Sequence, residues 1–132
     1  MSNPARRVLA SNKVAPTAKF FSQAVQVGNT IYVSGQVAMD ESGNIVGKND
    51  VRAQTRQVIA NISAVLAEAG ASLDDVVKVT MFITDMSRAG EAREVRLEFF
   101  TRQPPASTGV EVNALAHPDL LVEIEAIAVL RQ

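Results

Sequence analysis

The sequence predicts an α+β domain in which two helices cover one face of a sheet of five or six strands. Three observations carry this prediction. The first third of the chain is a series of β-rich runs separated by turn residues, two amphipathic helical stretches follow, and further β-rich runs come after each helix. One helix layer on one sheet layer is sufficient for a domain. Because the chain has 132 residues, 47% of them hydrophobic, we expect one core and one domain over residues 1–132.

The N-terminal third is predicted to be a β-meander. Its β-rich runs cover residues 6–10, 23–27 and 30–34, with a continuation over 35–39 and a short return at 45–46. Gly28-Asn29 separates two of these runs and is a strong signal for a two-residue hairpin. Residues 40–44, Asp-Glu-Ser-Gly-Asn, form a second turn cluster.

The remaining two thirds alternate between helix and strand. Over residues 50–69 apolar side chains recur at steps of three and four, and Gly70 is placed to cap the helix. Residues 76–83 are β-branched and continuous enough for a well-buried strand. A second helix is expected over 88–100, where Pro104-Pro105 prevents its continuation, and two more strands over 108–112 and 121–130.

The last strand carries apolar residues on both faces. Successive side chains of a strand point to opposite sides, so Val122, Ile124 and Ala126 face one way while Ile127 and Val129 face the other. Exposing such a surface costs roughly 25 cal/mol for each Å² of apolar area. We therefore expect a partner subunit to cover the second face; the alternative is cover by loops or by the N-terminal arm.

Composition excludes several classes of function. The chain has no Cys and one His, His117, so disulfides, thiolate nucleophiles and multi-imidazole metal sites are not expected. A net charge of −1 without a basic stripe argues against nucleic-acid binding. No apolar stretch approaches the roughly 18 to 20 residues that cross a bilayer, and the start lacks a signal-peptide core, so we expect a cytoplasmic protein without membrane contact.

Four sequence blocks, spread over nearly the whole chain, carry a family resemblance. They are Phe-Ser-Gln-Ala (21–24), Ile-Tyr-Val-Ser-Gly-Gln (31–36), Ala-Gln-Thr-Arg-Gln-Val (53–58) and Val-Glu-Ile-Glu-Ala-Ile-Ala-Val (122–129). In this order they resemble the RidA/YjgF family, also known as the endoribonuclease L-PSP or translation-inhibitor family. The last block, preceded by Pro105-Ala106 and by Val-Glu-Val at 110–112, is its most specific signature.

The resemblance implies a chorismate-mutase-like fold with a mixed sheet, and a homotrimer with a barrel-like core and ligand pockets between subunits. It also implies hydrolysis of reactive enamines or imines to a carbonyl compound and ammonia, without metal or organic cofactor. Glu123 matches the family's glutamate that orients the water. Ser34 and Gly35 match positions at a strand end that line the pocket. Without the family, Glu123 reads as an exposed strand glutamate, and Ser34-Gly35 as a strand terminus with a bulge.

The sequence also departs from the family's pattern. Ser107 stands where the imine hydrolases of the family carry an arginine that binds the substrate's carboxylate, and Phe21 replaces a tyrosine near the pocket. Arg93 stands where many relatives have an asparagine facing the cleft, so we expect it to supply the missing cation; the alternative is an exposed helix arginine beside an acidic neighbour. Ser107 and Thr108 are expected to shape the pocket, or else to serve as turn and ladder groups.

Two functions follow from this interpretation. The first is a deaminase-type hydrolase whose substrate differs from 2-aminoacrylate, because Ser107 replaces the carboxylate-binding arginine. The second is a non-enzymatic, metabolite-binding or chaperone-like trimer. Ribonuclease activity is disfavoured, since it needs cations that track phosphates and the net charge is −1.

Overall fold

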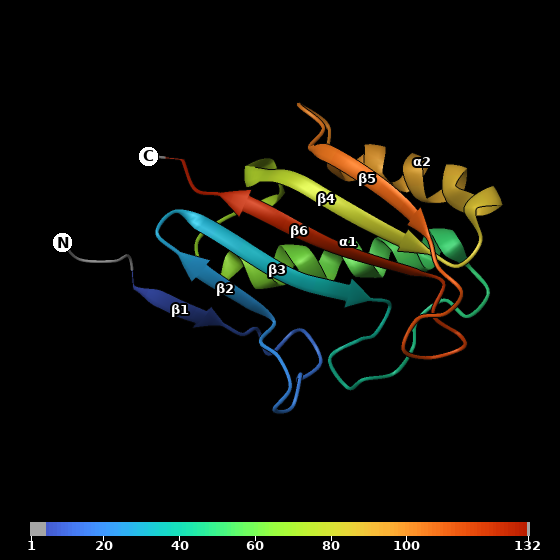
Figure 1. Cartoon of the computed structure of the whole chain (residues 1–132), viewed down its shortest axis with the longest axis horizontal. Helices are drawn as coiled ribbons and strands as arrows, with labels where there is room; N and C mark the ends of the chain where they lie inside the picture. The colour runs from blue at the N-terminus through green and yellow to red at the C-terminus, as the bar shows by residue number, and fades with distance from the viewer. Residues whose placement is uncertain (1–4, 132) are drawn as a thin grey trace.

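The computed structural model describes residues 5–131, which form one six-stranded sheet with two helices on one face (Figure 1). The strand order is β1-β2-β3-β6-β4-β5, and only β4 and β5 are parallel. The α+β prediction is therefore confirmed. The strands are β1 (Arg6–Leu9), β2 (Ala24–Val27), β3 (Thr30–Val37), β4 (Val76–Ile83), β5 (Ala106–Glu111) and β6 (Val122–Val129).

The N-terminal meander forms as expected, and β3 joins the predicted run at 30–34 to part of its predicted continuation over 35–39. Gly28, whose φ is 59°, turns the chain between β2 and β3. The strand then continues past Ser34-Gly35 to Val37, because a bulge at these two residues absorbs the register shift against β6. The predicted strand at 45–46 is only an isolated bridge between Met39 and Ile45.

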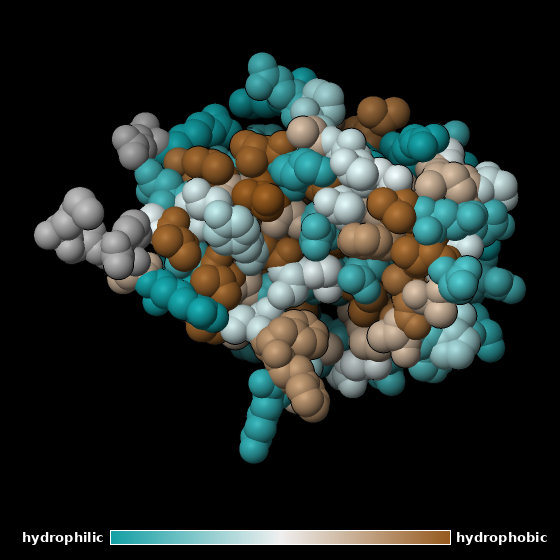
Figure 2. Space-filling model, viewed as in Figure 1, coloured by the Kyte–Doolittle hydropathy of each residue, from teal (hydrophilic) through white to brown (hydrophobic). Residues whose placement is uncertain are grey.

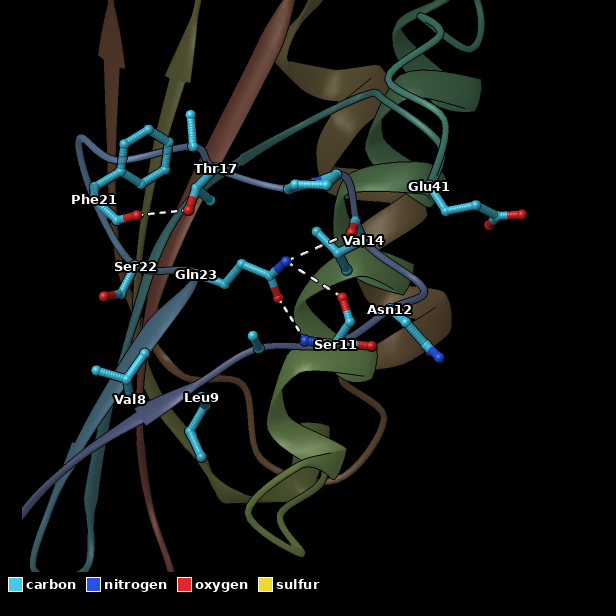
Figure 3. Close-up of a pocket in the computed structure, with 13 residues that line it drawn as sticks. Val8, Leu9, Ser11, Asn12, Val14, Thr17, Phe21, Ser22, Gln23 and Glu41 are labelled. Carbon is cyan, nitrogen blue, oxygen red and sulfur yellow. Dashed lines mark hydrogen bonds between the residues drawn. The ribbon is translucent and has the colours of Figure 1, made fainter.

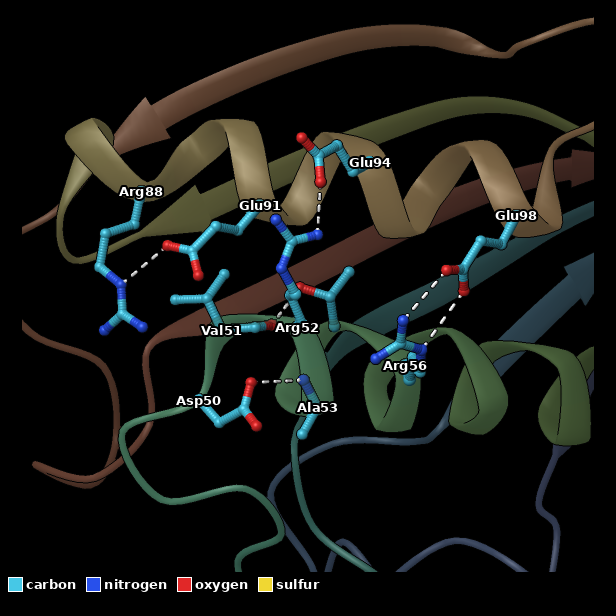
Figure 4. A network of polar contacts seen from close by, with 10 residues as sticks. Asp50, Val51, Arg52, Ala53, Arg56, Arg88, Glu91, Glu94 and Glu98 are labelled. Atoms are coloured by element: carbon cyan, nitrogen blue, oxygen red, sulfur yellow. Dashed lines mark hydrogen bonds and ion pairs between the residues drawn. The ribbon is translucent and has the colours of Figure 1, made fainter.

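The helices are α1 (Val51–Ala67) and α2 (Ala89–Phe99), within two residues of the predicted ends. Asp50 caps α1, its side chain accepting a hydrogen bond from the Ala53 amide at 3.0 Å. Within residues 5–131 neither helix is long and apolar enough to span a membrane. Figure 4 shows how acids on α2 meet arginines of α1 and of the turn before α2; the pairs are Arg52–Glu94, Arg56–Glu98 and Arg88–Glu91.

The sheet has one face under the helices and one open face. Val122, Ile124 and Ala126 of β6 are buried beneath the helices, as predicted. On the open face lie Glu125 and Val129, and Tyr32 of β3 is 51% exposed. Figure 2 shows apolar groups scattered among polar ones on the sheet's outer side. Neither helix covers this face.

One buried side chain connects the start of α1 to the chain that enters β6. Gln54 is fully buried, and its Nε2 donates to the carbonyl oxygens of Gly47 (3.1 Å) and Asp119 (2.8 Å). Its Oε1 accepts from the amide of Leu121 at 2.8 Å. These backbone groups are only partly accessible to water, and Gln54 supplies their hydrogen-bond partners. Gln54 thus fixes the segment immediately before Val122.

Candidate functional site

Glu123 lies on the open face of the sheet, directly against Gly35. It is paired with Val37 of β3 on one side and with Phe82 of β4 on the other. A Cβ added to Gly35 would stand 2.2 Å from Glu123 Oε2, so the carboxylate occupies the space above a backbone without a side chain. The bulge and the glycine together give this carboxylate its position.

The environment of Glu123 favours the protonated form of its carboxyl. Burial raises the pKa of its carboxyl above the usual value, and the negative charge of Glu125, two residues along the strand, raises the pKa further. A half-buried carboxylate of this kind accepts a proton from water more readily than an exposed one. Glu125 itself is exposed, and none of the ion pairs formed by the described residues includes it.

Ser34 and Phe21 lie near Gly35: Ser34 precedes it in β3, and Phe21 belongs to the loop before β2. The hydroxyl of Ser34 donates to the carbonyl oxygen of Ser22 at 2.6 Å and so connects β3 to the loop before β2. Phe21 and Gly35 line a common cavity of about 110 Å³. Figure 3 shows Phe21 near Thr17, apart from the buried amide of Gln23, which binds the main chain of Ser11 and fixes the loop.

A second group of the predicted residues lies between α2 and the start of β5. Arg93 and Ser107 line a cavity of about 320 Å³ that also includes Arg96 and the apolar side chain of Phe100. Arg96 Nη2 donates to Ser107 Oγ at 2.9 Å. Burial lowers the pKa of the Arg96 guanidinium below its usual value, and the positive charge of Arg93 lowers the pKa further. The expected cation is thus accompanied by a second one.

Thr108 does not join this second group within one chain. It is paired with Thr80, and its Oγ1 accepts from Lys78 Nζ at 3.0 Å. The side chains of Ser107 and Thr108 point to opposite faces because they are adjacent in a strand. Among the described residues that line the 320 Å³ cavity, Ser107 is present and Thr108 is not.

The two groups face opposite sides of the sheet. Ser107 is paired with Val79, which is buried under the helices, whereas Glu123 is paired with Phe82, the outward neighbour three positions on. Along the strands Ser107 and Glu123 are three residues apart, and across the sheet they are two strands apart; each of these separations is roughly 10 Å. One chain therefore presents two half-sites and cannot bring both to the same small ligand.

No cluster of three or more His, Asp or Glu suited to a metal occurs in residues 5–131.

Comparison with known proteins places this fold and site in a family. The sequence pattern of the endoribonuclease L-PSP family matches residues 11–130. The chain belongs to this family, the RidA/YjgF family. It is similar to a RutC family protein of Pyrococcus abyssi, with 46% identity over 94% of this chain and 97% of that protein.

Two further RidA/YjgF relatives bear on the site. The 2-iminobutanoate/2-iminopropanoate deaminase of Mus musculus is 37% identical over 98% of this chain and 95% of its own length. The crystal structure of TdcF of E. coli with bound serine has a TM-score of 0.88 and 31% identity, covering 95% of this chain and 99% of that one. These two names connect the family with imine deamination and with a small bound molecule.

Sequence analysis missed Arg96 in this RidA/YjgF member. The spacing of Arg93 and Arg96 was the available signal, because residues three apart in a helix lie on the same side. Arg93 alone was predicted to supply a cation, on the expectation that relatives carry an asparagine at its position. The hydrogen bond from Arg96 to Ser107 joins segments whose packing only the structure displays.

Gly35→Ala is expected to reduce activity much more than stability. The new Cβ takes the place of Glu123 Oε2, and because that side chain is flexible the carboxylate moves while the backbone stays. Gly35 does not have a positive φ, so alanine is sterically allowed and gains roughly 0.5–1 kcal/mol in unfolding free energy from its lower backbone entropy. The measurements are the rate of ammonia release and the urea midpoint. A variant with unchanged rate would show that Glu123 need not lie over Gly35.

Proposed function

We propose that this protein hydrolyses a reactive enamine or imine to a carbonyl compound and ammonia, with no metal or organic cofactor. The observation that carries the proposal is the half-buried Glu123 carboxylate, raised in pKa and held over the bare backbone of Gly35. The name of the Mus musculus relative, 2-iminobutanoate/2-iminopropanoate deaminase, supports the same chemistry.

The proposed reaction adds one water to a C=N bond. Glu123 orients the water and takes one of its protons as the oxygen attacks the imine carbon, and it passes this proton to the imine nitrogen, giving a carbinolamine. Glu123 then moves the hydroxyl proton of the carbinolamine to the same nitrogen, the C–N bond breaks, and ammonia leaves as the C=O bond forms. The amide groups near Gly35 are the proposed contacts for the polar end of the substrate, and Phe21 lines the pocket beside them.

The proposed site lies between subunits of a homotrimer, each subunit being a single domain over residues 1–132. The support is that Glu123 and Ser107 face opposite sides of one sheet, so a second copy has to bring the other half-site. The uncovered apolar groups on the open face, such as Tyr32, support an interface there. We place a small-molecule ligand in each cleft between subunits, with Thr108 at its edge.

The proposed substrate differs from 2-aminoacrylate. With Ser107 at the position of the family's arginine, the two-point charged contact to a carboxylate is missing, which costs roughly 1.5–3 kcal/mol in binding. Arg93 is the proposed anion anchor, on α2 rather than on β5. The carboxylate of the substrate is therefore held at a different distance from the reacting carbon.

The test is ammonia release from imines generated in the assay by oxidation of small, acidic and apolar amino acids. We expect the wild-type protein to accelerate hydrolysis of at least one class beyond the rate in buffer. The charge-conserving double variant Ser107→Arg/Arg96→Ser is expected to shift the preference toward small imines. A wild-type protein that accelerates none of them would overturn the proposal in favour of a metabolite-binding trimer without catalysis.

A further inference from the structure

The charged residues of α2 are segregated into two stripes. Glu91, Glu94 and Glu98 follow one side of the helix and are each paired with an arginine (Figure 4). Arg93 and Arg96 follow another side and line the 320 Å³ cavity. The acids of α2 are thus already neutralised and are not directed at the two cavity arginines.

Neither cavity arginine has an acidic partner among residues 5–131. Every ion pair of the described chain involves other residues, and the hydrogen bond of Arg96 goes to the neutral hydroxyl of Ser107. A guanidinium that is partly removed from water beside a like charge is unfavourable unless an anion joins it. Arg93 is exposed and Arg96 is partly buried, so the cavity carries two positive charges that no acid of residues 5–131 pairs with.

Ser107 contributes a donor to the same cavity. Its oxygen accepts the N–H of Arg96, and its own O–H remains available to donate to a ligand oxygen. The apolar surroundings, Leu97, Phe100 and Pro105, lower the local dielectric and strengthen such contacts. Two guanidinium groups and one hydroxyl provide more donors than a single carboxylate can accept in good geometry.

We infer that this cavity binds a dianionic end group, a phosphate or a pair of carboxylates. Arg96, positioned by Ser107, and Arg93 each contribute a charged contact. The substrate class, which rests on the proposed function, is then an imine or enamine that carries such an end group. The cavity of about 320 Å³ that the two arginines share with Ser107 is the space for this end group.

Binding of inert anions tests the cavity without catalysis. In calorimetric titrations of the intact protein with dianionic inorganic phosphate, succinate and acetate, we expect one of the two dianions to bind best and acetate to bind weakly. Arg96→Gln or Arg93→Gln should weaken dianion binding by roughly ten- to hundred-fold. Arg52→Gln is the matched control, since it removes an equal charge that is paired with Glu94.

Each outcome of the titration has a defined meaning. A phosphate preference identifies a phosphorylated end group, and a succinate preference identifies a second carboxylate. Acetate binding as tight as that of both dianions, or equal losses in Arg96→Gln and Arg52→Gln, would overturn the inference. Arg96→Lys keeps the positive charge but lacks the planar, two-point geometry of the guanidinium, so we expect a dianion affinity between those of wild type and Arg96→Gln. This variant separates loss of binding from misfolding of Arg96→Gln.

An activity comparison separates this inference from the proposed function. In one outcome the wild-type protein hydrolyses the imine of glutamate faster than 2-iminobutanoate, and this preference disappears in Arg96→Gln. That result supports both the deaminase function and a carboxylate end group on the substrate. Hydrolysis without any preference for either dianionic class contradicts the inference alone. Dianion binding that depends on Arg96, with no hydrolysis of any imine, supports the cavity and contradicts the deaminase.

Discussion

Glu123→Gln is expected to lower kcat/KM for imine hydrolysis by roughly 100- to 10,000-fold, the usual contribution of a positioned acid–base group. Glutamine retains the shape that packs on Gly35 but cannot take a proton from water. The measurement is ammonia release at saturating and limiting substrate. Glu125→Gln is the control, because Glu125 is an exposed carboxylate on the same side of β6 and should retain most of the activity.

The pH dependence of imine hydrolysis tests the same role of Glu123. Because burial and Glu125 raise the pKa of Glu123, the active carboxylate form is lost at a higher pH than for an exposed glutamate. Activity should therefore rise with pH through this raised pKa. Removing the negative charge in Glu125→Gln should move the acidic limb to lower pH. If Glu123→Gln kept both its rate and the same acidic limb, another group would be the base.

The same pKa shift separates loss of activity from loss of fold. A carboxyl with a raised folded-state pKa binds more protons folded than unfolded, so its contribution to stability is present below the unfolded-state pKa and is lost as pH rises through the folded-state value. At neutral pH the charged Glu123 opposes folding. Glu123→Gln should thus unfold at the same or a higher urea concentration than wild type.

Gln54→Leu is expected to lower the free energy of unfolding by about 3–5 kcal/mol. Three partly buried backbone groups, those of Gly47, Asp119 and Leu121, lose their side-chain partner, and each unsatisfied group costs about 1–3 kcal/mol, nearer the lower figure where water can reach it. Leucine is as large as glutamine, so the loss arises from hydrogen bonding rather than from a cavity. Urea denaturation monitored by circular dichroism gives the value.

Gln57→Leu is the control for this change, one turn further along α1. Its amide is only partly buried and donates to the side chain of Asn61 at 2.9 Å, so no backbone group depends on it. We expect a change of about 1 kcal/mol or less. Equal losses in the two variants would mean that the Gln54 contacts do not hold the entry to β6.

Much of the fold is predictable from local patterns. The β-branched run predicted the bounds of β4 correctly, and the apolar spacing predicted α1 to within two residues at each end. The pairing of β3 with β6 across the bulge at Ser34-Gly35 was not predicted, because it joins segments that lie far apart in the sequence. Strand order likewise depends on contacts between distant segments, which local spacing does not encode.

The site was predictable only as far as single residues carry their own signal. Glu123 and Gly35 were identified from the family's blocks, and the structure places them in contact. The bond from Arg96 to Ser107 depends on how α2 packs beside β5, and the alternation of Ser107 and Thr108 separates two residues that the sequence shows side by side. Their roles in binding stay predictions.

The central claim is that Glu123 of one subunit and Arg96 of another act on the same substrate. The direct measurement is subunit complementation with a substrate that carries a dianionic end group, in which the Glu123→Gln and Arg96→Gln chains, each impaired alone, are refolded together in equal amounts. Random mixing restores about one quarter of the sites if each site takes one residue from each of two subunits. Recovery of imine hydrolysis to about that level is the predicted result. Activity no greater than the sum of the separate variants would contradict the account.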